Sequence, residues 1–99
     1  MDIKKTVEGG KLAVALSGRL DTVTAPQLQG ELDTSLAGVT ELAFDFASLD
    51  YISSAGLRVL LSANKKMLAV GGQMTIAGAN AVVREVFDMT GFSDIFTLV

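Results

Sequence analysis

DFASLDYISSAGL, residues 45–57, is the stretch of this sequence that decides the fold. It links an apolar segment that alternates with period two, residues 41–46, to the strongest helical pattern in the chain, residues 53–69. Strict alternation is typical of a β-strand, and apolar residues three or four positions apart are typical of an amphipathic helix. The helix is predicted to bury a leucine stripe made of Leu57, Leu60, Leu61 and Leu68. A strand that runs into such a helix indicates an α/β fold.

The sequence upstream of this stretch predicts a hairpin and a first helix. Residues 3–7 and 11–17 are expected to be strands, because Gly9-Gly10 between them suits a tight turn. The second strand has large apolar residues on one face and Ala or Ser on the other, which predicts an interior strand covered on both sides. A helix of about a dozen residues should follow and end near Gly38, with Thr24 as its N-cap and Gln27 completing a capping box.

Downstream of the central helix, a short strand is expected at residues 74–77. Asn80 is predicted to cap a third helix that Gly91 ends, and residues 95–98 are predicted to form a last strand. The order is β-β-α-β-α-β-α-β, which favours one domain over residues 1–99, a small mixed β-sheet with an N-terminal hairpin and helices packed against it. The methionines at 67, 74 and 89 are expected to fill the core.

Composition argues against several classes of protein. The 99 residues include no Cys and no His, so the commonest metal ligands and the commonest general base are absent, and no catalytic residue, metal or cofactor is predicted. The net charge is −3, and the only adjacent basic pairs, Lys4-Lys5 and Lys65-Lys66, suit solvated surface charges better than a nucleic-acid site. No run has the length of a signal peptide or a membrane span, so a cytoplasmic protein is expected.

Ser53 and Ser54 begin the central helix, and two roles are open to them. Serine at a helix start is commonly an N-cap, worth about 1 kcal/mol. The alternative is a phosphoacceptor, since a phosphate there would meet the unpaired N–H groups and the positive end of the helix dipole. Spacing alone favours capping, but capping accounts for one serine and leaves the other without a role.

Three segments resemble a known family, the STAS domain of bacterial anti-sigma factor antagonists. Residues 45–57 resemble its signature, in which an acidic residue ends a strand and a box such as D-S-S-G opens the next helix. Residues 18–25, Gly-Arg-Leu-Asp followed by Thr-Ala, are similar to its G-x-L-D…T-A segment, and residues 87–92 resemble its closing helix and turn. The resemblance makes Ser54 the candidate phosphoacceptor. Ser53 stands where many members have Asp, and Ala55 where many have Ser or Thr.

The resemblance implies a partner-switching cycle. The unphosphorylated protein would bind an anti-sigma factor, itself a serine kinase of the histidine-kinase-like ATPase type, and so release a sigma factor. Phosphorylation of Ser54 would end that binding, and a serine phosphatase would restore it. The residues that this implies for partner binding are Asp21, Thr22, Asp50, Ser53, Ser54, Ala55, Gly56 and Arg58.

Structural roles are also open to Asp21, Arg58 and Tyr51, and for Arg58 the structural role is the favoured one. Asp21 is expected either to touch the partner or to accept backbone hydrogen bonds in a turn. Arg58, four residues after Ser54, is expected to meet a phosphate or a partner acid, or to be a solvated surface charge. Tyr51 is expected to line the docking surface or to pack in the core.

Two other functions remain open. The first is a STAS scaffold that is not phosphorylated and serves a transporter or a sensory complex. The second is an enzyme or nucleotide binder, which the sequence disfavours because it has no G-x-x-x-x-G-K-[ST] loop.

Overall fold

The computed structural model describes residues 1–99 as one five-stranded sheet with three α-helices. The predicted order of elements is confirmed, with one added 3-10 turn, Phe92–Asp94, before the last strand. The elements are β1 (Asp2–Glu8), β2 (Lys11–Leu20), α1 (Ala25–Ser35), β3 (Glu41–Ile52), α2 (Ser54–Ala69), β4 (Gln73–Ala77), α3 (Ala81–Thr90) and β5 (Thr97–Leu98).

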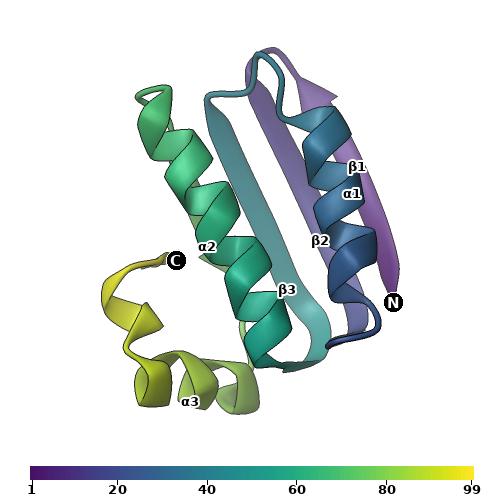
Figure 1. Ribbon diagram of the computed structural model, residues 1–99, viewed down its shortest axis with the longest axis vertical. Helices are drawn as coiled ribbons and strands as arrows, with labels where there is room; N and C mark the ends of the chain where they lie inside the picture. Colours follow the sequence, from purple (N-terminus) through teal and green to yellow (C-terminus); the bar gives the residue numbers. More distant parts are fainter.

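The strands lie in the sheet in chain order, β1 to β5. β1 pairs antiparallel with β2, and each later strand pairs parallel with the one before it. Figure 1 shows α1 and α2 side by side over one face of the sheet, with α3 near the end at which α1 and α2 begin. That end carries the carboxyl ends of the parallel strands, where α/β sheets usually hold their functional groups.

The core lies between the sheet and the helices, and most of the predicted apolar positions are in it. Leu61 of the predicted leucine stripe is only half-buried and packs against this core, and two further predicted members are exposed. Leu68 is 65% exposed, because the buried stripe of α2 runs through Leu60, Ala63 and Met67 and leaves Leu68 beside it in solvent. Met89 is 78% exposed on the outer side of α3, so its prediction as core filler is wrong, whereas Met67 and Met74 are buried.

β3 is longer than the predicted strand, which stopped at residue 46. It continues to Ile52 because its pairing with β2 resumes after each of two register shifts, and each shift inserts one extra residue into β3. The shifts change the spacing of its buried residues from two to three, as Phe46, Leu49 and Ile52 show. Asp45 therefore does not end the strand; it lies beside the first shift, where its Oδ1 accepts a hydrogen bond from the Ala47 N–H at 2.9 Å.

The helix ends agree with the sequence prediction at α3 but not at α1. Asn80 caps α3 by accepting a hydrogen bond from the Val83 N–H, and it also donates to the Leu49 carbonyl of β3. Gly91 ends α3 at a φ of 80°. Thr24 is the N-cap residue of α1, but its side chain makes no capping hydrogen bond, because that hydroxyl is used in the turn before the helix.

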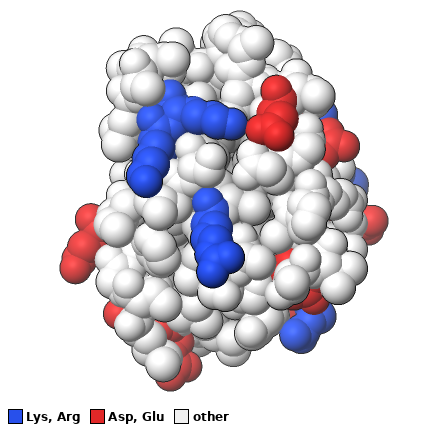
Figure 2. Space-filling model, in the orientation of Figure 1, with Lys and Arg blue, Asp and Glu red and all other residues white.

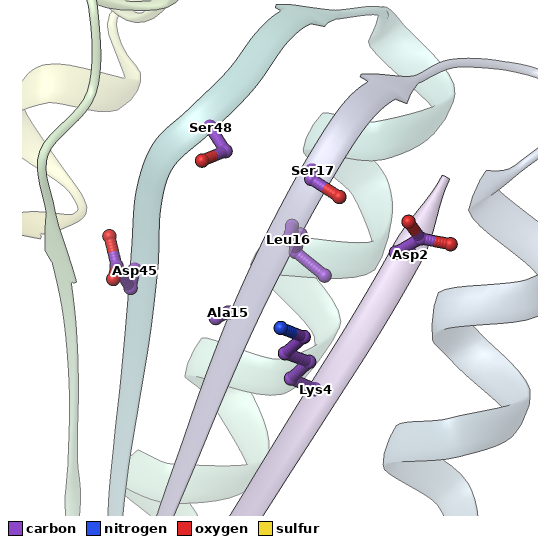
Figure 3. A pocket seen from close by; sticks show the side chains of 7 residues that line it. All are labelled: Asp2, Lys4, Ala15, Leu16, Ser17, Asp45 and Ser48. Carbon is purple, nitrogen blue, oxygen red and sulfur yellow. The ribbon is translucent and has the colours of Figure 1, made fainter.

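The face of the sheet turned away from α1 and α2 is not covered by a helix, so the prediction that β2 is covered on both sides is wrong. Ala13, Ala15 and Ser17 are half-exposed there. A shallow hollow of about 140 Å³ lies on this face, lined by residues of β1, β2 and β3 that include Lys4, Ala15 and Asp45 (Figure 3). Small side chains have little apolar area, so leaving this face of the sheet exposed to water costs little free energy.

No helix of the structure combines the length and the apolar character that crossing a bilayer requires.

Candidate functional site

The predicted site residues come from two segments that the sheet brings together. β2 ends at Leu20 and β3 ends at Ile52, and these two residues are paired in the parallel register. The backbone N–H of Ser53 then donates to the Leu20 carbonyl at 2.9 Å. Asp21 and Ser53, 32 positions apart in sequence, thus follow directly from one pair of adjacent strand ends.

Ser53 and Ser54 have different environments. Ser53 is the N-cap residue of α2, but its side chain makes no capping hydrogen bond, and its Oγ is buried without a partner. Ser54 is the first residue of α2 and is exposed. Side-chain capping therefore accounts for neither serine, and only the Ser54 hydroxyl is open to another protein.

The segment from Gly18 to Thr24 forms a turn with its own hydrogen bonds. Gly18 has a φ of +94° beside the second register shift, a conformation that favours glycine. Asp21 Oδ1 accepts from the N–H groups of Val23 and Thr24 at 3.0 and 3.1 Å. Thr24 Oγ1 accepts from the Asp21 N–H and donates to the Arg19 carbonyl. The turn role predicted for Asp21 is therefore confirmed.

These contacts hold the pKa of Asp21 below its ordinary value, chiefly through the hydrogen bond from the Thr24 backbone N–H and also through that from Val23. A carboxylate favoured in the folded state stabilises the protein above its unfolded pKa, and that contribution is lost as pH falls through the lower folded pKa.

We expect the pH dependence of Asp21→Asn to reveal this contribution. Urea unfolding of the wild type and of Asp21→Asn should differ at neutral pH, and the difference should shrink below the unfolded pKa of about 3.9. Both proteins contain the same other carboxylates, so the contributions of those groups to the pH dependence cancel in the difference between the two unfolding free energies. A difference that stays constant down to the acid limit would show that the charge of Asp21 adds nothing to folding.

Gly56 lies where a side chain has no room. A Cβ at this position would come within 2.7 Å of Leu20 Cγ and 2.9 Å of Ile52 Cγ1. Gly56 therefore lets the first turn of α2 sit directly on the ends of β2 and β3, while its neighbour Ala55 is half-buried. This close packing places Ser54 at the end of the sheet.

The remaining predicted residues, Thr22, Asp50 and Arg58, are exposed. Asp50 is the extra residue at the second register shift of β3, and Arg58 makes no hydrogen bond or ion pair within the chain.

Tyr51 is half-buried rather than part of the core, and the guanidinium of Arg19 lies 4.4 Å from its ring centroid. Arg19 is also 3.8 Å from Asp21 Oδ2, so it joins the two segments of the site at the surface. The sequence prediction missed Arg19, because its pairing with Tyr51 depends on the register shifts of β3.

The hollow of the open sheet face is joined by a second one, which shares Lys4, Ala15 and Asp45 with it and extends to Ala77 of β4. Neither hollow includes any of the predicted partner-binding residues. No group of three or more Asp or Glu side chains is arranged to hold a metal ion.

A sheet of this topology, with an exposed serine at the start of the helix after β3, matches a known class of regulatory domain. The chain belongs to the STAS domain family, whose model matches residues 2–99. It is 40% identical over 88 residues to BtrV of Bordetella bronchiseptica, which is named as an anti-sigma factor antagonist; the match covers 88% of this chain and 76% of BtrV. It is 29% identical to the anti-sigma F factor antagonist of Paenibacillus polymyxa, over 90% of this chain and 78% of that one.

Among solved structures, the fold is similar to that of the Bacillus cell fate determinant SpoIIAA in its phosphorylated form. The TM-score is 0.77 at 21% identity, and the alignment covers 99% of this chain and 91% of SpoIIAA.

Proposed function

We propose that this protein is an anti-sigma factor antagonist that acts by binding and is switched by phosphorylation of Ser54. The unphosphorylated protein binds an anti-sigma factor, a serine kinase of the histidine-kinase-like ATPase type, and so frees a sigma factor. The kinase phosphorylates Ser54, and a serine phosphatase reverses the step. The cycle takes place in the cytoplasm.

The observation that carries this proposal is the difference between the two serines. The Ser54 hydroxyl is exposed at the first position of α2, whereas the Ser53 hydroxyl is buried. A phosphate on Ser54 would stand at the positive end of a 16-residue helix whose first turn contains no acidic residue, so the fold can accept the modification. The names of the two relatives support the partner assignment, since both are named as antagonists of anti-sigma factors.

The switch needs no refolding. Phosphoserine adds about −1.5 to −2 charges at neutral pH. About 6 Å from a partner carboxylate, that charge costs roughly 1 to 5 kcal/mol, depending on the effective dielectric. A cost of about 4 kcal/mol would lower affinity about a thousandfold. Asp21 and Thr22, in the turn after β2, and Asp50, near the end of β3, lie close to the strand ends that precede Ser54 and are proposed to contact the same partner.

The test is phosphorylation by the serine-kinase anti-sigma factors of the source bacterium, each incubated with this protein and ATP. Wild type and Ser53→Ala should both gain one phosphoryl group, located on residue 54 by peptide mass spectrometry, and Ser54→Ala should gain none. Ser53→Ala is the matched control, because it removes the neighbouring hydroxyl without touching the proposed acceptor. Absence of phosphate on wild-type Ser54 with every such kinase would favour the unphosphorylated scaffold.

A further inference from the structure

The charge of this protein is unevenly distributed. α2 contains Arg58, Lys65 and Lys66 and no acidic residue, so it carries +3. The rest of the chain contains five basic and eleven acidic residues, a net charge of −6. Figure 2 shows basic side chains over α2 on the helix-covered face, with most acidic side chains towards the margin of the view. One helix is therefore a basic surface on an acidic protein.

Two of these three cations have no partner within the chain. Lys66 Nζ is 3.2 Å from Asp33 Oδ1 of α1, so its charge is matched. Arg58 and Lys65 are exposed and make no ion pair or hydrogen bond. They lie on the same side of α2 as Ser54, since these residues recur at intervals of four and seven positions. We call Ser54, Arg58, Leu61, Lys65 and Leu68 the α2 outer stripe.

Favourable interaction with the helix dipole accounts for only two of the three cations of α2. Lys65 and Lys66 lie towards the C-terminal end of α2, where cations interact favourably with the helix dipole. Arg58 lies near the N-terminal end, where a cation gains nothing from the dipole. The first turn of α2 also has no acidic residue to offset the positive end of the helix dipole. The charge at the Ser54 end of α2 is thus uncompensated within the molecule.

We propose that the α2 outer stripe is a docking surface for an acidic region of the protein that phosphorylates Ser54, an inference that rests on the proposed function. Arg58 and Lys65 pair with carboxylates of that region, and Leu68, 65% exposed, and the half-buried Leu61 supply apolar contact between them. A compact acidic protein surface fits better than DNA or an anionic membrane, because the net charge of −6 outside α2 would repel an extended polyanion.

This surface also connects binding with phosphorylation. Residues four positions apart on a helix are neighbours, so a phosphate on Ser54 stands beside Arg58. The phosphate then competes with the partner's carboxylates for the guanidinium while adding negative charge to the stripe. Phosphorylation thus weakens docking along α2 as well as at the acceptor itself.

The test compares two double variants with the same change in charge, Arg58→Gln/Lys65→Gln and Lys4→Gln/Lys11→Gln. Lys4 and Lys11 are exposed, unpaired and on the open face of the sheet. Association with the kinase identified above is measured by stopped flow from low to physiological salt. We expect the α2 variant to associate about tenfold more slowly at low salt and to show a flatter salt dependence. The control should stay within about twofold of wild type.

An equal decrease in the association rate of both variants would show that only net charge matters and would overturn the proposal. Association of the α2 variant at the wild-type rate would also overturn it. Binding of DNA or of phosphatidylserine vesicles that depends on Arg58 and Lys65, without an effect on the kinase, would also overturn it.

If wild type binds no kinase at all, the proposed function fails, and the surface is tested separately by NMR titration with a glutamate hexapeptide. Amide shifts confined to α2 in wild type and absent from the α2 variant support the docking surface. Shifts that are absent, or spread over the molecule, refute it.

Discussion

Ser54→Asp should bind the anti-sigma factor more weakly than Ser54→Ala does. Alanine keeps the surface neutral and removes only an exposed hydroxyl, so its affinity should match that of the wild type. Aspartate places one negative charge at the start of α2. About 6 Å from a partner carboxylate this costs about 0.7 to 2.8 kcal/mol, a loss in affinity of roughly 3- to 100-fold. Isothermal titration calorimetry at physiological salt measures the difference.

The matched control for Ser54→Asp is Thr6→Asp, which adds the same charge to an exposed position on β1. Urea unfolding should show that all three variants are as stable as the wild type within about 0.5 kcal/mol, as expected for surface substitutions. Equal affinity of Ser54→Ala and Ser54→Asp would rule out the charge mechanism. An equal loss in Thr6→Asp would show that the effect is not located at the start of α2.

The second large effect is expected at Gly56. Valine there would force its Cβ to within 2.7 Å of Leu20 and 2.9 Å of Ile52, both completely or almost completely buried. Overpacking of this kind costs about 3 kcal/mol, which urea unfolding measures directly. Binding to the anti-sigma factor should fall as well, because the displaced side chains end the two strands that carry Asp21 and Ser53.

Gly30→Val is the control for Gly56→Val. Gly30 is also a glycine within a helix, but a Cβ there would meet nothing within 4 Å. Its stability should stay within about 0.5 kcal/mol of the wild type, since valine is slightly better than glycine in a helix. If the two valine variants unfold alike, the close packing of α2 on the strand ends does not contribute to stability.

The fold was predictable from the sequence where periodicity is regular. The order of strands and helices follows from the hairpin glycines, the leucine spacing in α1 and α2 and the Asn80 cap. Prediction failed where tertiary contacts change a local pattern. The register shifts in β3 alter the spacing of Phe46, Leu49 and Ile52, so alternation marked only the first half of that strand. Thr24 lost its expected cap because Asp21 and Arg19 engage its hydroxyl.

By itself, the sequence determined that two serines begin the central helix and that a Gly-x-Leu-Asp segment ends the second strand. Only the tertiary structure decided how they meet. Parallel pairing joins Leu20 to Ile52 across 32 positions, which no local pattern encodes, so Asp21 and Ser53 follow adjacent strand ends. The packing of Gly56 on those strand ends sets the start of α2 there. The hydroxyl of Ser53, the N-cap residue, is then buried, whereas Ser54, the first residue of the helix, is exposed.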